Sequence, residues 1–143
     1  MSTLPVTVPE NPASKARLPV HAERSLASEI IAAAIDVHRV LGPGLLESAY
    51  QACLCRELAL RTIAFVQQVD LPLVYKGLKL DYGYRIDLIV AERIIVELKA
   101  VQDLPPVHQA QLITYLRLTG LRVGLLINFN VPVLKNGIRR RVL

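Results

Sequence analysis

The most informative part of the chain reads Asp81-Tyr-Gly-Tyr-Arg-Ile-Asp-Leu-Ile-Val-Ala-Glu-Arg-Ile-Ile-Val-Glu-Leu-Lys99. It predicts two strands, Tyr84 to Val90 and Ile94 to Lys99, around a short polar turn at residues 91–93. Valine and isoleucine dominate both halves, as is typical of a buried sheet. We therefore expect a β-hairpin inside a sheet.

Three charged residues, Asp87, Glu97 and Lys99, interrupt this hairpin where apolar residues would be less costly. With a three-residue turn, Val90 pairs with Ile94 and Asp87 lies directly opposite Glu97. Lys99 points to the same face as Glu97 because side chains alternate along a strand. The sequence thus predicts two carboxylates and an ammonium on one patch of the sheet.

Electrostatics makes this patch a candidate metal site. Two carboxylates about 4 Å apart repel by roughly 1 kcal/mol in water and about 4 kcal/mol at an effective dielectric constant of about 20. Lys99 offsets one charge, and a hard divalent ion such as Mg²⁺ would offset the rest. The alternative is an edge hairpin with a solvated polar face and a cross-strand Glu/Lys pair.

Composition places the chain among globular proteins of one domain. It has 143 residues, of which 52% are hydrophobic. No apolar run approaches the roughly 18 residues that span a bilayer, and the N-terminus lacks the apolar core of a signal peptide, so a cytoplasmic protein without membrane contact is expected. The net charge of +5 and the pI near 9.5 are compatible with a polyanionic partner.

The two cysteines, Cys53 and Cys55, carry no signal of a site. On a helix they face about 200° apart, which disfavours both a disulfide and a shared metal site. We interpret them as core thiols.

The first residues of the chain, 1–22, are proline-rich and polar and predict a disordered arm, followed by one domain at 23–143. Within that domain we expect the order α-α-β-β-β-α-β(-β), an α/β fold on a mixed sheet. The helices are expected from about Ser25 to Leu41, from just after Gly44 to about Arg61, and from about Val107 to Thr119. The strands are expected at Ala64 to Tyr75, Leu78 to Val90, Ile94 to Lys99 and Leu121 to Asn128, with a short one within Val131 to Leu143.

Several polar residues outside the hairpin have ordinary structural explanations. Glu47 lies in the first turn of a helix, where the macrodipole favours a carboxylate by about 0.3–1 kcal/mol. His38 precedes a helix end and is explained as a partly exposed residue near the C-terminal dipole. Tyr50 is explained as a core aromatic, and Gln111 and Tyr115 share a helix face with His108 as a hydrated polar stripe.

Taken together, however, these residues resemble a known family. The segment Val37-His38-Arg-Val-Leu41-Gly42-Pro43-Gly44-Leu-Leu-Glu47-Ser-Ala-Tyr50 is similar to the signature of the GxxExxY proteins, which are placed in the PD-(D/E)xK nuclease superfamily. The similarity continues over residues 25 to 143, through Tyr75-Lys76-Gly77, Gly83-Tyr-Arg-Ile-Asp87, Glu97-Leu-Lys99, Gln111-Leu-Ile-Thr-Tyr115 and Gly124-Leu-Leu-Ile-Asn128-Phe129. Within the superfamily it resembles the RecB-like exonuclease branch.

The resemblance implies a restriction-endonuclease-like core and a Mg²⁺- or Mn²⁺-dependent nuclease. Glu47, Asp87 and Glu97, with the Leu98 carbonyl, would bind the metal, and their three negative charges against Lys99 leave a charge of −2 that one divalent ion neutralises. The remaining implied roles are catalysis by Lys99, Gln111 and Tyr115, support of Glu47 by His38 and Tyr50, and nucleic-acid binding by Arg85, Lys99 and Gln111.

Three function classes follow. The first is a metal-dependent nuclease acting on nucleic acid, with DNA favoured. The second is a catalytically silent nucleic-acid-binding or scaffold module with the same fold. The third, ranked last, is a small-molecule enzyme that uses the same metal cradle, because fold does not fix function. The expected partners are nucleic acid and, in a homodimer, a second copy of the chain.

Overall fold

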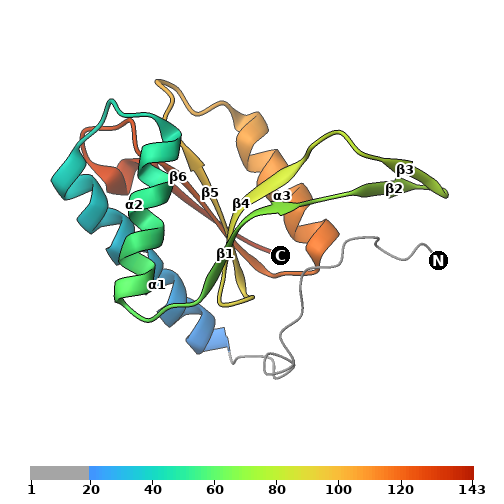
Figure 1. The fold of residues 1–143 in the computed structure, drawn as a ribbon, viewed down its shortest axis with the longest axis horizontal. Coiled ribbons are helices and arrows are strands. Elements are labelled where there is room, and N and C mark those ends of the chain that lie inside the picture. The colour runs from blue at the N-terminus through green and yellow to red at the C-terminus, as the bar shows by residue number, and fades with distance from the viewer. Residues whose placement is uncertain (1–19) are drawn as a thin grey trace.

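A five-stranded mixed sheet with helices on both faces forms the protein (Figure 1). The computed structural model describes residues 20–143. The helices are α1 (Val20–Leu41), α2 (Glu47–Leu60), α3 (Pro106–Thr119) and the short 3₁₀ helix η2 (Leu134–Gly137). The strands are β1 (Phe65–Asp70), β2 (Leu73–Tyr75), β3 (Leu78–Leu80), β4 (Arg85–Val90), β5 (Ile94–Lys99), β6 (Val123–Asn128) and β7 (Ile138–Val142). The main sheet has the order β1-β4-β5-β6-β7, which confirms the predicted α/β class on a mixed sheet.

The predicted hairpin is β4–β5 at the middle of this sheet. Val90 pairs with Ile94 and Leu88 with Val96, as a three-residue turn requires. Ala91 and Glu92 adopt left-handed backbone angles in that turn, with φ of 50° and 56°. The register predicted from the sequence is therefore confirmed.

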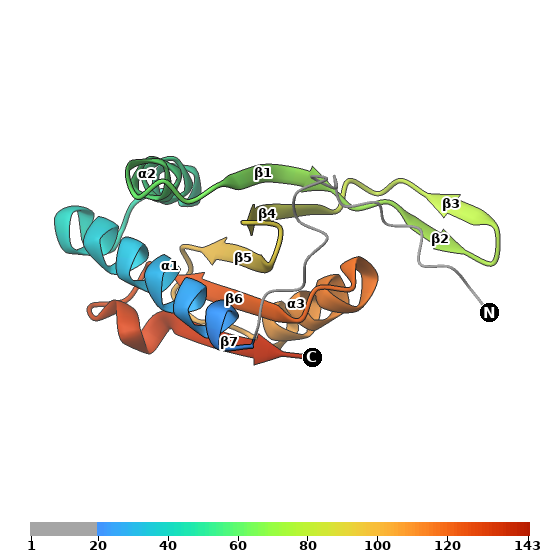
Figure 2. The same cartoon turned by 90° about the horizontal axis from the view of Figure 1, so that it is seen from below.

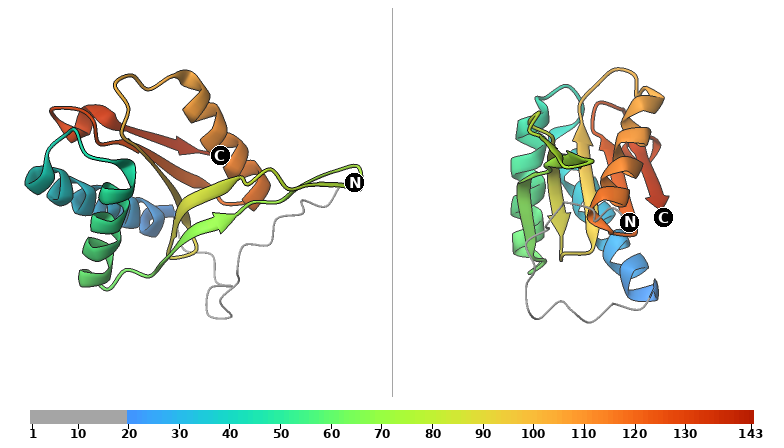
Figure 3. Two further views of the ribbon diagram at one scale, coloured as in Figure 1. Left: turned by 45° about the horizontal axis from the view of Figure 1, so that its top comes forward. Right: turned by 90° about the vertical axis from the view of Figure 1, so that its right-hand side faces the viewer.

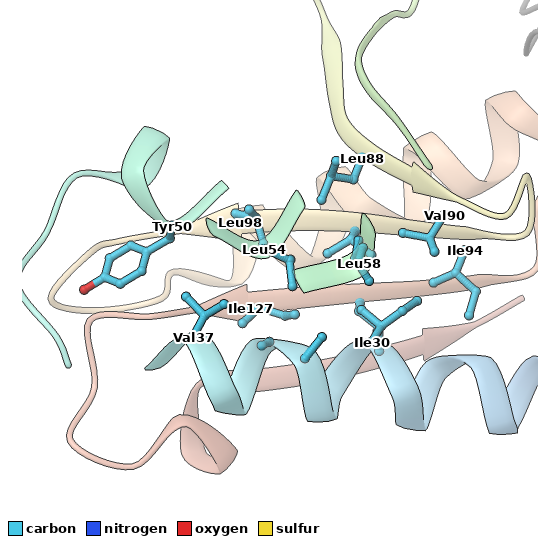
Figure 4. Close-up of a cluster of buried hydrophobic side chains, with 14 of the residues drawn as sticks. Ile30, Val37, Tyr50, Leu54, Leu58, Leu88, Val90, Ile94, Leu98 and Ile127 are labelled. Carbon is cyan, nitrogen blue, oxygen red and sulfur yellow. The ribbon is translucent and has the colours of Figure 1, made fainter. Parts of the chain in front are cut away.

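Two hydrophobic clusters cover the two faces of the sheet. Figure 3 shows the helices that lie on either side of it. On one face, α1 and α2 bury residues such as Ile30 and Leu54 against Leu88, Val96 and Ile127 (Figure 4). On the other face, α3 packs over a smaller cluster that contains Ile86, Ile89, Ile95, Leu112 and Leu126. A central strand buried on both faces explains the almost continuous apolar runs in the sequence.

The position of α3 is fixed by the crossover that it forms between β5 and β6. These strands are parallel, with Ile95 paired to Gly124, so the connection must cross one face of the sheet. A Cβ added to Gly124 would lie 2.7 Å from Leu112 Cδ1 of the helix. Gly124 therefore lets α3 approach the sheet closely, which holds the side chains of α3 near the end of β5.

The strand order differs from the expected one between residues 64 and 90. Two long strands were predicted there, but each is broken in two, so that β2 and β3 form a separate two-stranded sheet. The break in the first strand falls at Pro72, which has no N–H to donate to a sheet ladder. The hairpin β2–β3, with its predicted turn at Lys76-Gly77, projects beyond the rest of the fold in Figures 1 and 2.

The first helix also begins earlier than expected. It starts at Val20 rather than near Ser25, so residues 20–22, assigned above to the arm, are helical. Ala22, Glu23 and Arg24 are good helix formers, and Glu23 in the first turn suits the positive end of the macrodipole. The rest of the predicted arm lies outside the described residues.

Two smaller observations concern the cysteines and the membrane. Cys55 is buried and Cys53 is half-buried, and both are free thiols. Within residues 20–143, no helix has the length and apolar character that crossing a membrane would require.

Candidate active site

Asp87 and Glu97 meet at the point where the paired residues of β4 and β5 end and hydrogen bonds to side-chain carboxylates join the two strands. The ladder runs from Val90–Ile94 to Leu88–Val96. One step further, the Asp87 N–H donates to Glu97 Oε1 at 3.0 Å, and the Leu98 N–H donates to Asp87 Oδ2 at 2.8 Å. The two carboxylates are thus anchored reciprocally to the opposite strand, and Asp87 faces Glu97 as the register predicts.

A local distortion of β4 allows this arrangement. Ile86 and Ile89 pack on the α3 side of the sheet, whereas Leu88 packs on the α1–α2 side. Strict alternation would place Ile86 and Leu88 on one face, so the alternation shifts at Asp87. Gln68 on the neighbouring strand takes a left-handed φ of 52° at the same level of the sheet. The shift directs the Asp87 carboxylate toward β5.

The carboxyl of Glu97 has a strongly perturbed pKa. Glu97 is only 4% exposed to solvent. Burial, and then the charge of Asp87, raise the pKa of Glu97 to about 8, although the Asp87 N–H and Lys99 act in the opposite direction. Without a compensating cation, Glu97 is therefore largely protonated at neutral pH.

Lys99 lies on the α3 side of the sheet with Glu97. Ile95 belongs to the cluster under α3, so Glu97 and Lys99, two and four residues on, share that face. Burial and the Lys99 ammonium lower the pKa of His108, which places the first turn of α3 near Lys99. The backbone after Lys99 is fixed by Asn128, whose side-chain amide bonds both the N–H and the C=O of Val101.

Glu47 approaches from α2, which it begins. A carboxylate in the first turn of a helix is ordinarily favoured by the macrodipole, which would lower its pKa. Instead, partial burial and then Asp87 raise the pKa of Glu47, while Lys99 lowers it. Glu47 therefore lies close enough to Asp87 and Lys99 for their charges to change its pKa. Its favourable position in the first turn of α2 does not explain this.

The face of α3 that carries Gln111 and Tyr115 turns toward the same place. Burial, and then Glu97, Asp87 and Tyr84, raise the pKa of Tyr115 to about 12. Gln111 and Tyr115 also line a cavity of about 160 Å³, together with Leu71, Leu73, Tyr84, Thr114 and Leu118. Part of the α3 face that was predicted to be a hydrated polar stripe, at Gln111 and Tyr115, therefore lines a cavity.

One comparison with known proteins is decisive. Residues 24–141 match the family model described as the PD-(D/E)XK nuclease superfamily. The chain belongs to the PD-(D/E)XK nuclease superfamily. The restriction-endonuclease-like fold follows from this match and from the mixed sheet between helices. No curated protein and no solved structure shows significant similarity to the chain.

PD-(D/E)XK nucleases generally use divalent metal ions. The donors present suit such an ion, because Asp87, Glu97 and Glu47 offer hard carboxylate oxygens and two of these groups show raised pKa values. Within residues 20–143, however, no three His, Cys, Asp or Glu side chains lie close enough together to hold a metal ion as they stand. The carboxylate oxygens of Asp87 and Glu97 are of the kind that suits the superfamily's metal, and Glu47 does not form a three-residue group with them.

His38 and Tyr50 were expected to support Glu47. Both side chains form hydrogen bonds to backbone groups of nearby loops. Tyr50 is fully buried and stacks on Phe129, with ring centroids 4.5 Å apart. Its hydroxyl donates to the Gly42 carbonyl at 2.5 Å and accepts from the Leu45 N–H at 3.1 Å. His38 Nε2 bonds the Val131 carbonyl at 2.8 Å. Tyr50 thus holds the loop that leads into α2. His38 was expected to be partly exposed, and this expectation is wrong, since His38 is buried.

Removing the Tyr50 hydroxyl tests this support. Tyr50→Phe keeps the ring stack but leaves the Gly42 carbonyl and the Leu45 N–H without that partner. We expect a loss of about 1–3 kcal/mol in the free energy of unfolding, measured by urea denaturation. Phe129→Leu would instead remove the stack and keep the hydrogen bonds. An unchanged stability of Tyr50→Phe would show that the loop is held by other contacts.

Arg85 and Leu98 are the remaining positions to which the resemblance gives a role. Arg85 is exposed at the start of β4 and forms an ion pair with Asp70 at 3.2 Å. The Leu98 N–H is engaged by Asp87, and its carbonyl remains a predicted ligand. Two residues near the site, His108 and Tyr84, were missed. The i, i+3 spacing of His108 and Gln111 signalled the first, whereas the second depends on how the segment between β3 and β4 lies against α3.

Proposed function

We propose that the protein is a metal-dependent nuclease that hydrolyses phosphodiester bonds of nucleic acid, with DNA as its substrate. The observation that carries this proposal is the pair of hydrogen bonds by which the Asp87 and Glu97 carboxylates each accept a backbone N–H of the opposite strand. The pair lies beside Lys99 at one end of the central hairpin β4–β5. A purely structural hairpin gains nothing from burying the Glu97 carboxyl beside a second carboxyl, because burial and the neighbouring charge both oppose its ionised form. The alternative of a solvated edge hairpin conflicts with the central position of β4–β5 in the sheet.

Asp87, Glu97 and Glu47, with the Leu98 carbonyl, are the residues that would hold a Mg²⁺ or Mn²⁺ ion. When bound, such an ion supplies charge neutralisation and Lewis-acid stabilisation of the reacting phosphate. The raised pKa of Glu97 supports this assignment, because the carboxyl is held in a form that a cation would convert to the carboxylate. Binding is therefore expected to release protons near neutral pH.

The chain's own groups have distinct tasks in hydrolysis. A water oxygen forms a bond to phosphorus, the bond from phosphorus to the leaving oxygen breaks, and the water's proton passes to a base or to solvent. The Lys99 ammonium would contact the phosphate or orient that water, and it stabilises the negative charge that develops there. Gln111 and Tyr115 would position the strand, and Arg85 would contact its backbone.

The finer family placement belongs to the same proposal. We place the chain among the GxxExxY proteins and in the RecB-like branch on the basis of the motifs around Glu47, Asp87 and Tyr115. The net charge of +5 supports sequence-independent contacts with a polyanion, whose strength should fall steeply with salt.

A thermal-shift titration tests the metal site. Metal that binds only the folded state raises the melting temperature in proportion to the logarithm of its concentration once the site is saturated. We expect Mn²⁺ or Mg²⁺ at about 100 times the dissociation constant to add about 2.7 kcal/mol to the free energy of unfolding. Asp87→Asn should abolish most of this response while it preserves the hydrogen bond from the Leu98 N–H. A wild-type melting temperature that does not change across millimolar Mn²⁺ would contradict the metal site.

A cleavage assay then separates the nuclease from the silent binding module. Single-stranded, duplex and flapped DNA, and matching RNA, are incubated with the protein and Mg²⁺ or Mn²⁺, and EDTA serves as the control. We expect metal-dependent cleavage of at least one DNA substrate. Binding of nucleic acid without cleavage of any substrate would replace this proposal with the binding module.

A further inference from the structure

Tyrosine side chains gather on the projecting hairpin β2–β3 and the segment that returns from it. Tyr75, Tyr82 and Tyr84 are three of the five tyrosines in the chain. They are 63%, 72% and 40% exposed, although an aromatic side chain that stabilised the fold would be buried. A two-stranded hairpin has little core of its own, so these side chains contribute little to its stability.

One face of this hairpin is apolar along its whole length. Leu73 pairs with Leu80 and Tyr75 with Leu78. Residues that pair directly, and residues two apart on one strand, lie on the same face. That face therefore carries Leu73, Tyr75, Leu78 and Leu80, and it becomes more exposed from the root of the hairpin to its tip.

At the root, this apolar face leads into the cavity beside the candidate active site. Leu73 and Tyr84 line the cavity of about 160 Å³ on the hairpin side, and Gln111 and Tyr115 line it from α3. The carboxyls of Glu97 and Asp87 act on the Tyr115 hydroxyl, so the inner wall of the cavity borders the carboxylate pair. The cavity is smaller than the roughly 300 Å³ of sites for drug-sized ligands and suits a single ring system.

Positive charge accompanies the aromatic side chains. The Lys76 Nζ lies 5.3 Å from the centre of the Tyr75 ring, whereas Lys79, which pairs with Val74, lies on the opposite face of the hairpin. Aromatic rings that stack on bases, beside cations that contact phosphates, are the usual means of binding single strands without sequence preference. A lysine over the exposed ring at the tip favours a polyanionic strand over a protein partner, since the cores of protein interfaces are depleted of lysine.

We propose that the hairpin β2–β3 and the cavity at its root bind unpaired bases, so that the substrate class is a single strand or a single-stranded end. This inference rests on the proposed nuclease function. One base would enter the cavity against Tyr84 next to the scissile phosphate, and a neighbouring base would stack on Tyr75. In a duplex the faces of the bases are covered by one another, so these contacts select against paired nucleic acid.

Binding is measured first, in EDTA, so that it does not depend on cleavage. The probes are a fluorescently labelled oligothymidylate and a duplex of the same length, followed by anisotropy. We expect the single strand to bind at least about 10-fold more tightly than the duplex. Tyr75→Ala and Tyr84→Ala should each weaken single-strand binding by about 5- to 100-fold and leave duplex binding unchanged.

Conservative and remote variants serve as controls. Tyr75→Phe and Tyr84→Phe keep the ring and should retain binding within about twofold, because stacking needs no hydroxyl. Leu60→Ala removes an exposed apolar side chain at the end of α2, away from the hairpin, and should bind like the wild type. Since Tyr75 lies at the exposed tip, its variants keep the test valid even if Tyr84→Ala fails to fold.

Equal affinity for both probes, or an unchanged affinity of Tyr75→Ala, would overturn the inference. So would a Tyr75→Ala variant that dissociates a dimer in sedimentation without any effect on binding, because the face would then join two copies of the chain. A cleavage arm with Mn²⁺ distinguishes the two proposals. Cleavage that does not favour unpaired DNA overturns this inference alone, and tight single-strand binding without any cleavage overturns the nuclease alone.

Discussion

Replacing Lys99 with alanine is expected to lower metal-dependent cleavage by about 10²–10³-fold while the fold remains intact. One partly exposed ammonium contributes little to stability, since surface charges are worth about 0–1 kcal/mol. In the proposed reaction the same ammonium would face developing negative charge in a partly water-excluded site. The measurements are single-turnover cleavage at saturating substrate, the melting temperature and the affinity for labelled DNA in EDTA.

Lys135→Ala is the matched control for this experiment. Lys135 is an exposed lysine on η2, outside the group of residues around Asp87 and Glu97. Its removal should change the affinity for DNA slightly, as one lost phosphate contact does, and leave the cleavage rate at saturation unchanged. If Lys99→Ala weakened DNA binding strongly but cleaved at the wild-type rate when saturated, Lys99 would be a binding residue only.

A second large effect is expected in the pH dependence of stability of the metal-free protein. The Glu97 pKa is about 8 in the folded state against an ordinary value of 4.5. Between these values the folded state holds more protons than the unfolded state, so the free energy of unfolding falls as pH rises from about 4.5 to about 8. The fall is on the order of 3–5 kcal/mol, which corresponds to about 10–17 °C in melting temperature.

Glu97→Gln should remove most of this dependence. The glutamine keeps an Oε1 acceptor for the Asp87 N–H but carries no charge, so we expect the variant to match the wild type near pH 5 and to exceed its stability near pH 9. Glu29→Gln, on the exposed face of α1, is the control and should follow the wild type at every pH. Thermal melts in EDTA from pH 5 to pH 9 provide the comparison. Parallel curves for wild type and Glu97→Gln would show that Glu97 titrates normally.

The hairpin that carries the site could be read from the sequence because its signals are local. Strand-forming residues on either side of a three-residue turn fix the register, and the register fixes which charged residues oppose one another. The same holds for the end of α3, where Gly120 takes the left-handed angle that its position predicts. Local turn chemistry was therefore enough to predict that Asp87 and Glu97 meet.

Other features depend on contacts between distant segments and had no local signal. The start of α1 at Val20 was missed because Ser25 resembles an N-cap, yet the residues before it are equally good helix formers. The shift of side-chain alternation at Asp87 depends on how β1 and α3 pack beside β4. The partial exposure expected for His38 is wrong because its ring packs and hydrogen-bonds against the backbone carbonyl of Val131, 93 residues away.

The tight turn between β4 and β5 also has a consequence for the order of assembly. Asp87 and Glu97 are only ten positions apart, so they meet when one short loop closes, a step that takes microseconds in isolated hairpins. The helix on the Glu97 face, α3, packs over the sheet only when the crossover from β5 to β6 has formed, and that step is slower because β5 and β6 are parallel strands separated along the chain. The two carboxyls therefore come together while still hydrated, and the burial that raises the pKa of Glu97 arises only when α3 covers that face of the sheet.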